Sequence, residues 1–154
     1  MALAFEAVLA ALPRAPAPVR LAHPNRRIRY AGFIKVSRYL ADALAGVAVS
    51  PQLAKLLDYG PRRAAPDWAE DQTVLANTAA EVQQIVAEHG WLIAPTVPNP
   101  PFPHSQAEPV AQADFTCLAN IAGLPALSLP MGWTGDGLPL GVQIIGCKGN
   151  DAGL

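Results

Sequence analysis

Charged residues are scarce in this 154-residue sequence, and so are cysteines and long apolar runs. Asp, Glu, Lys and Arg together make up 15% of the chain, while hydrophobic residues make up 51%. This balance excludes an intrinsically disordered chain, which combines low hydrophobicity with high net charge. No apolar run reaches the roughly 18 residues that a membrane-spanning helix needs, so a membrane protein is not expected.

The two cysteines, Cys117 and Cys147, form neither a CxxC motif nor a dense disulfide framework. Such sparse use of cysteine is typical of a reduced, cytoplasmic protein. The apolar N-terminus has no basic region before it, and Glu6 interrupts it, which argues against a signal peptide. We therefore expect an amphipathic helix there and a cytoplasmic location.

Positive and negative charges are divided unevenly along the chain. Residues 1–63 hold ten Lys or Arg against three acids, whereas residues 64–154 hold Lys148 alone against nine acids. A basic half can indicate a face that binds nucleic acid. Here the basic residues are scattered, with no aromatic stacking platform and no recognisable motif, so no nucleic-acid partner is expected.

Prolines and glycines punctuate the chain, with 16 prolines against a usual share of about 5%. Helices are predicted over residues 2–12, 33–46, 51–60, 66–89 and 112–122, and strands over residues 91–94, 126–130 and 138–145. Ser50 is expected to cap the third helix, and Gly46, Gly90 and Gly123 to end the helices that precede them. The segment Pro95–Pro103 contains five prolines and is expected to be a stiff extended loop. Asp136-Gly137 predicts a hairpin between the last two strands.

Three segments of the C-terminal half carry a resemblance. They are Leu92–Pro98 (LIAPTVP), Phe115–Gly132 (FTCLANIAGLPALSLPMG) and Asp136–Gly146 (DGLPLGVQIIG). In order, spacing and residue type, residues 90–150 resemble the C-terminal part of the amidase signature family. The resemblance implies an α/β fold, the C-terminal portion of the amidase signature fold, with helices packed on short strands of a mixed sheet. Residues 1–89 match only in character, so we expect a helix-rich variable region there and an amidase-like segment at 90–154.

Enzymes of that family hydrolyse carbon–nitrogen bonds of carboxylic amides with a lysine, a serine in a cis peptide and a second serine as nucleophile. Both serines lie in a Gly/Ser-rich stretch of the N-terminal half. The four serines of this chain, Ser37, Ser50, Ser105 and Ser128, lie in no such run. The resemblance therefore assigns no catalytic residue to this chain. We expect the isolated chain, as a C-terminal piece of a truncated hydrolase, to be inactive.

The resemblance also implies candidates for the wall of the substrate pocket, because the family places the loop after this strand and the following helix close to the substrate. The candidates are Thr96, Val97, Pro98, Phe102 and Phe115. For each of them, an ordinary place in the core or in a loop remains an equally good interpretation. The identity of the substrate cannot be predicted, since such loops vary with it.

Other chemistry-bearing residues support no site of their own. His104 and Ser105 are adjacent and cannot easily form a base–nucleophile pair with a third group orienting the base. His104 and Glu108 are two ligands at most, between prolines that disfavour a helix, so no metal site is expected. The glycines after residue 131 do not fit GxGxxG, and no cofactor is expected.

A different class of function stays open beside the hydrolase. A chain that begins at Met1 in the middle of a family fold is expected to leave open sheet edges and apolar surface. It would then be a non-catalytic truncated or partner-binding protein that associates with its own copies or with a complementing chain. If the missing half is supplied, we expect a small-molecule amide as the substrate.

Overall fold

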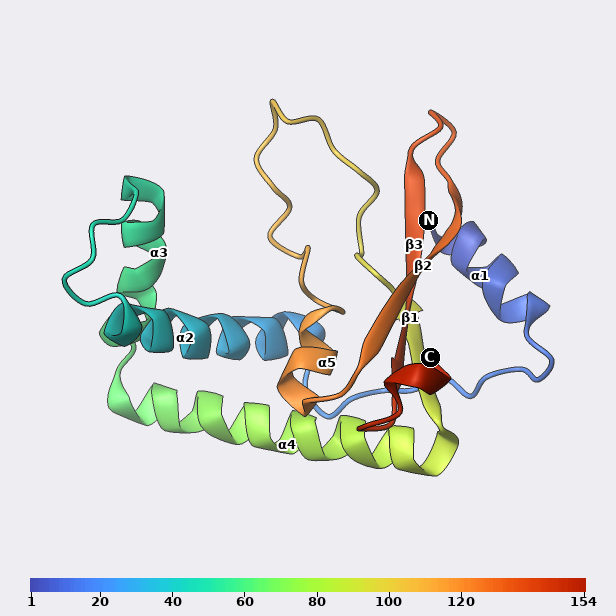
Figure 1. The fold of residues 1–154 in the computed structure, drawn as a ribbon, viewed down its shortest axis with the longest axis horizontal. Helices are drawn as coiled ribbons and strands as arrows, with labels where there is room; N and C mark the ends of the chain where they lie inside the picture. Colours follow the sequence, from blue (N-terminus) through green and yellow to red (C-terminus); the bar gives the residue numbers. More distant parts are fainter.

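The structure is a computed structural model that describes residues 1–154 and has the α/β class predicted above. Its elements are α1 (Ala2–Ala11), α2 (Asn25–Ala43), α3 (Pro51–Arg62), α4 (Ala65–His89), β1 (Trp91–Pro95), α5 (Cys117–Ala122), β2 (Ala126–Trp133), β3 (Pro139–Gly146) and a final 3-10 turn (Asp151–Gly153). Helices α2 and α4 run side by side, with α3 at one end of the molecule and the sheet at the other (Figure 1). None of these helices is long and apolar enough to cross a membrane.

Helix α2 begins at Asn25, eight residues before the predicted start at residue 33. Its core positions Ile28, Ala31 and Ile34 are spaced by three residues and are completely buried. Three arginines, Arg26, Arg27 and Arg29, surround the first of these positions and hide the periodicity in the sequence, which explains the wrong prediction. The helix ends at Ala43, so Gly46 is not its cap but lies in the turn beyond it, with φ of +78°.

Helix α3 begins as predicted, because the Ser50 side chain accepts a hydrogen bond from the Leu53 amide at 3.2 Å. The predicted stop at Gly60-Pro61 is wrong, since the helix continues to Arg62. Pro61 has no N–H to offer the carbonyl of Leu57, four residues earlier. The Ser37 hydroxyl of α2 lies 3.0 Å from that carbonyl oxygen and 2.8 Å from the Leu56 carbonyl oxygen, so its single proton is shared between the two acceptors.

Helices α4 and α5 end where predicted, at Gly90 (φ +86°) and Gly123 (φ +64°), backbone conformations that favour glycine. The start of α5 was predicted at residue 112, but the helix begins at Cys117. Residues 110–116 form successive turns instead. The predicted loop over Pro95–Pro103 begins one residue later, since Pro95 is the last residue of β1, and residues 96–109 contain neither helix nor strand.

The three strands form an antiparallel sheet in the order β1-β3-β2, and β2 with β3 forms the predicted hairpin. Its turn is closed by a hydrogen bond from the Thr134 amide to the Leu138 carbonyl at 2.8 Å. Strand β2 was predicted to end at Pro130 but runs on to Trp133. A bulge between Pro130 and Gly132 lets pairing resume one residue out of step.

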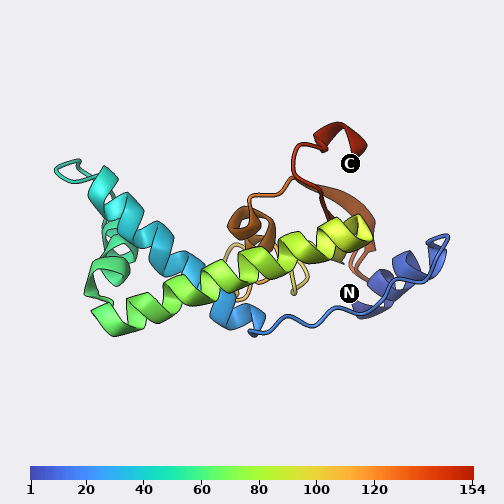
Figure 2. The same cartoon turned by 90° about the horizontal axis from the view of Figure 1, so that it is seen from below.

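Each face of the sheet carries part of the core. On one face, Ile145 and Leu92 pack against residues of α2, α4 and α5, including the fully buried Ile28. On the opposite face, Met131, Leu140 and Val142 are covered by α1 through Met1, Ala4, Phe5 and Val8. Figures 1 and 2 show α1 beside the sheet, away from the other helices and joined to α2 by a long extended segment.

Both edge strands carry a proline whose backbone nitrogen points away from the sheet. The Thr96 amide donates to the Gly141 carbonyl at 2.8 Å, and the Gly146 amide donates to the Pro125 carbonyl at 3.0 Å. Because pairing alternates along an antiparallel ladder, Pro95 of β1 and Pro130 of β2 occupy the positions that face outward.

A buried ionic cluster joins α2, the end of α3 and α4. Asp71 is completely buried, and its carboxylate lies 2.6 Å from Nη1 of Arg27 and 2.8 Å from Nε of Arg63. Burial alone would raise the pKa of Asp71, but the hydrogen bonds and positive charges of the two arginines outweigh it and hold the pKa below its ordinary value. The cluster therefore holds α2 and the C-terminal end of α3 against α4.

Candidate substrate-pocket wall

Two hydroxyl groups meet on the face of the sheet where the proline-rich loop leaves β1. Thr96 Oγ1 lies 2.7 Å from Ser128 Oγ, and either hydroxyl can be the donor. Thr96 directly follows β1 and its amide is anchored to Gly141 of β3, while Ser128 belongs to β2 on the other side of β3. The pair therefore bridges the two outer strands across the middle one.

Gly141 leaves open the space beneath this hydroxyl pair. A Cβ atom at Gly141 would lie 2.8 Å from Thr96 Oγ1 and 3.4 Å from Ser128 Oγ. Any larger side chain at Gly141 would displace Thr96, so the glycine is required by this close approach. The absence of a side chain lets the two hydroxyls meet across the middle strand.

Gln143 links the same face of the sheet to the segment that precedes α5. Its side chain is buried, and its Nε2 donates to the Phe115 carbonyl at 3.4 Å. Gln143 lies two residues from Gly141 on β3, on the same face of the sheet as Gly141 and Ser128. The structure thus brings Thr96 and Phe115, which are distant in sequence, to neighbouring positions along one strand.

The other three residues that the resemblance placed at the pocket wall follow Thr96 into the loop. Val97, Pro98 and Phe102 are all partly buried. Their place at a substrate pocket remains a prediction. The same loop holds Asn99, whose Nδ2 is buried and has no hydrogen-bond partner.

Three residues of this wall were missed by the sequence analysis: Ser128, Gly141 and Gln143. A signal was present, because Ser128 and Gln143 are the polar residues of two otherwise apolar strands. Their shared face follows only from the strand register, which pairs Ser128 with Gln143.

Cys117 lies at the start of α5 and is not an activated nucleophile. Burial, together with the nearby negative charge of Asp114, raises the pKa of its thiol to about 11. The thiol is therefore almost entirely protonated at neutral pH, whereas reactive cysteines are thiolates. Cys117 is thus a partly buried side chain with an unreactive thiol.

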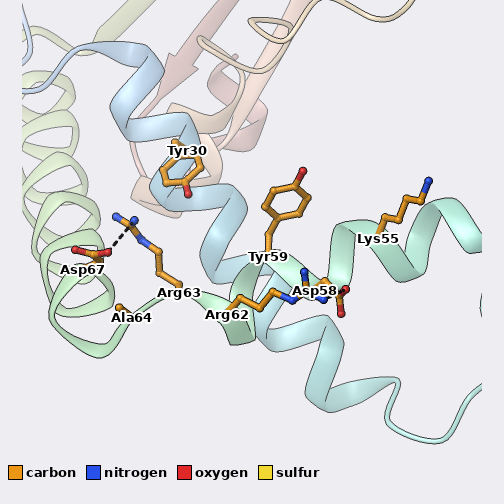
Figure 3. Close-up of a pocket in the computed structure, with 8 residues that line it drawn as sticks. All are labelled: Tyr30, Lys55, Asp58, Tyr59, Arg62, Arg63, Ala64 and Asp67. Atoms are coloured by element: carbon orange, nitrogen blue, oxygen red, sulfur yellow. Dashed lines mark hydrogen bonds and ion pairs between the residues drawn. The ribbon is translucent and has the colours of Figure 1, made fainter.

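A separate depression of about 520 Å³ lies between α2, α3 and the start of α4, lined by Tyr30, Lys55, Asp58, Tyr59, Arg62, Arg63, Ala64 and Asp67 (Figure 3). Its charges are mostly paired within it. Arg62 lies 2.8 Å from Asp58, and Arg63 lies 3.2 Å from Asp67 and also binds the buried Asp71. The depression is remote from the hydroxyl pair, and no three His, Cys, Asp or Glu residues cluster anywhere in the chain to hold a metal ion.

The sequence profile described as Amidase matches residues 35–154, which is most of the chain, so the chain belongs to the Amidase family. The A-subunit of glutamyl-tRNA(Gln) amidotransferase from Treponema pallidum is 40% identical over 73 residues, which are 44% of this chain and 14% of that protein. Its counterpart from Thermus thermophilus is 40% identical over 79 residues, which are 49% of this chain and 17% of that protein.

Solved structures show the same fold. A chain from a vestigial protein complex that reveals the evolutionary origins of an s-triazine catabolic enzyme superimposes with a TM-score of 0.76 at 21% identity, over 98% of this chain and 36% of that chain. The glutamyl-tRNA(Gln) amidotransferase A-subunit of Thermotoga maritima gives 0.71 at 24% identity, over 97% and 35%. A bacterial aryl acylamidase of the amidase signature family gives 0.65 at 20% identity, over 85% and 32%. The fold is thus that of the amidase signature enzymes, and the chain spans about a third of each.

Proposed function

We propose that this chain forms one wall of the substrate pocket of an enzyme that hydrolyses carbon–nitrogen bonds of carboxylic amides. The observation that carries the proposal is the Thr96–Ser128 hydroxyl pair, held at 2.7 Å on an exposed part of the sheet. Membership of the Amidase family supports the type of reaction. In this proposal residues 1–89 are supporting scaffold, and residues 90–154 carry the wall.

The wall binds and orients substrate but does not break its bond. Ser37 bonds to backbone groups, Ser50 caps α3 and Ser128 bonds to Thr96, so none of these hydroxyls contacts a lysine or histidine that could take its proton. Ser105 is exposed in the loop and makes no hydrogen bond. Nucleophilic catalysis by serine requires such a base within hydrogen-bond reach. We therefore propose that the chain is inactive alone and acts with a complementing polypeptide that supplies the catalytic groups.

A complementation assay tests this function. The purified chain is incubated with simple aliphatic and aromatic amides, alone and together with the segment of the Thermotoga maritima amidotransferase that lies outside the structural match. We expect no ammonia release from either component alone, and release when both are present. Release by the chain alone, proportional to its concentration through successive purification steps, would contradict its inactivity.

A matched variant decides whether the proposed wall takes part. Gly141→Val fills the space beneath the hydroxyl pair, whereas Gly135→Val alters a turn glycine that has no atom within 4 Å of an added Cβ. We expect complementation to be lost only with Gly141→Val, while both variants keep their helical circular dichroism. A different result would be that the unaltered chain mixed with the amidotransferase segment hydrolyses no amide, although the folded chain still binds that segment. That result would favour the non-catalytic, partner-binding alternative.

A further inference from the structure

The proposed wall lies in a part of the chain that has no permanent positive charge. Residues 64–147 contain neither lysine nor arginine. The charged residues between Trp91 and Cys147 are Glu108, Asp114 and Asp136, and all three are acidic. The wall and the elements that carry it are therefore neutral or negative, although the whole chain has a net charge of only −1.

The arginine of α2 that reaches the segment before α5 is already paired with an acid. Arg29 of α2 reaches the segment before α5, where its Nε lies 2.5 Å from Asp114 Oδ1, one residue before Phe115. Lys148 follows β3 at the end where Gly146 pairs with Trp91, which is the end opposite Thr96. Neither of these cations is thus placed to pair with an anion at the hydroxyl pair.

The polar groups that the wall does offer are uncharged. The Thr96 and Ser128 hydroxyls can each donate and accept a hydrogen bond. Apolar side chains surround them in sequence, including Val97, Pro98 and Phe115. Such a surface can form hydrogen bonds with a neutral amide and apolar contacts with an alkyl or aryl group.

We propose that this wall selects amides in which the part that contacts the wall is uncharged, and rejects amides that carry a carboxylate in that part. The proposal rests on the proposed function and names its substrate class. A carboxylate placed on the wall would lose water against apolar side chains and would gain no counter-ion in return. A neutral amide group of the same length meets neither penalty.

A titration followed by nuclear magnetic resonance tests the preference on the 154-residue chain itself. Hexanamide is compared with adipamate, an amide of the same chain length that ends in a carboxylate, at about pH 8, well above the histidine reference pKa of about 6.5. We expect hexanamide to shift the backbone amide signals of Thr96, Ser128 and Gln143. Adipamate should require at least a tenfold higher concentration for the same shift.

Two variants that add one positive charge complete the test. Ser128→Lys places a cation at the wall and should reverse the preference in favour of adipamate, whereas Gln84→Lys, on the exposed side of α4, should leave it unchanged. Equal or tighter binding of adipamate by the unaltered chain would overturn the proposal. Absence of shifts with both ligands would overturn it as well. The complementation assay reports separately on amide hydrolysis, so a reconstituted enzyme that prefers adipamate would contradict this inference alone.

Discussion

Gly60 and Ser37 are joined at the crossing of α3 and α2, where the Gly60 amide donates to Ser37 Oγ at 2.8 Å. The single proton of that hydroxyl is shared between the carbonyls of Leu56, at 2.8 Å, and Leu57, at 3.0 Å. Arg38 Nη1 donates to the Gly60 carbonyl at 2.8 Å. The helices approach so closely that a Cβ atom at Gly60 would lie 2.9 Å from the Arg38 Cα. One serine and one glycine therefore define how α3 docks.

The first prediction follows from this close contact. Gly60→Ala should lower the free energy of unfolding by about 1 to 3 kcal/mol, because the added methyl group meets backbone that cannot move without separating the helices. Urea denaturation measures the change. Gly135→Ala is the matched control, since an added Cβ there meets no atom within 4 Å, and it should stay within about 0.5 kcal/mol. Equal effects of the two substitutions would contradict the packing that we describe.

The second prediction concerns the buried carboxylate of Asp71. Asp71→Asn leaves Arg27 and Arg63 without their shared anion and should cost about 3 kcal/mol at pH 7. Because the folded pKa of Asp71 is below its ordinary value, its contribution is present above the unfolded pKa of about 3.9 and is lost as the pH falls through the folded pKa. The difference between wild type and variant should therefore shrink below about pH 4.

The exposed pair of Asp58 and Arg62 provides the control for this experiment. Both side chains are more than half exposed, and their atoms are 2.8 Å apart. Asp58→Asn should change the free energy of unfolding by less than about 1 kcal/mol at pH 7, because solvent screens surface ion pairs. Thermal melts of wild type and both variants at pH 7 and pH 3 measure all these quantities. A stability difference between wild type and Asp71→Asn that is the same at pH 7 and pH 3 would contradict the role of the ionised Asp71 carboxylate.

The third prediction is that Cys117 is inert in the folded protein. With a pKa of about 11, its thiolate fraction at pH 8 is on the order of one in a thousand. In a Cys147→Ser background, iodoacetamide should modify Cys117 at least a hundredfold more slowly than it modifies the same protein in denaturant. Mass spectrometry against time measures both rates. Comparable rates in the two conditions would show that the thiol is not buried as described.

The fourth prediction concerns the coupling of the two hydroxyls in the proposed wall. Ser128→Ala and Thr96→Val should each lower stability by about 1 kcal/mol, the usual net contribution of one hydrogen bond. The double variant should cost little more than either single one, because both remove the same bond. Urea denaturation of the four proteins gives the coupling energy. Fully additive losses would mean that the 2.7 Å contact contributes nothing to stability.

Several helix ends could be predicted because their signals are local. Ser50 caps its helix through its own side chain, and Gly90 and Gly123 end theirs through a positive φ that glycine readily adopts. The continuation of α3 through Pro61 could not be predicted. It depends on the hydroxyl of Ser37, which lies 20 residues from the Leu57 carbonyl that it binds.

The candidate wall could likewise be predicted only in part, because its residues are distant in the sequence. The resemblance pointed to Thr96 and Phe115, and the structure places both beside the same stretch of β3. Ser128 and Gln143 escaped notice because a polar residue in an apolar strand does not reveal which face it occupies. That face is determined by the register of β2 against β3, and one residue of slippage would reverse it.

The outward-facing prolines of β1 and β2 have a consequence for the fate of the protein at high concentration. Neither edge strand carries a charged side chain, and bare edges of this kind are the usual starting point for fibril growth. Pro95 and Pro130 each remove an outward hydrogen-bond donor, so an incoming strand finds its ladder interrupted. The sheet thereby carries its own protection against amyloid-like stacking, built into the two strands that need it.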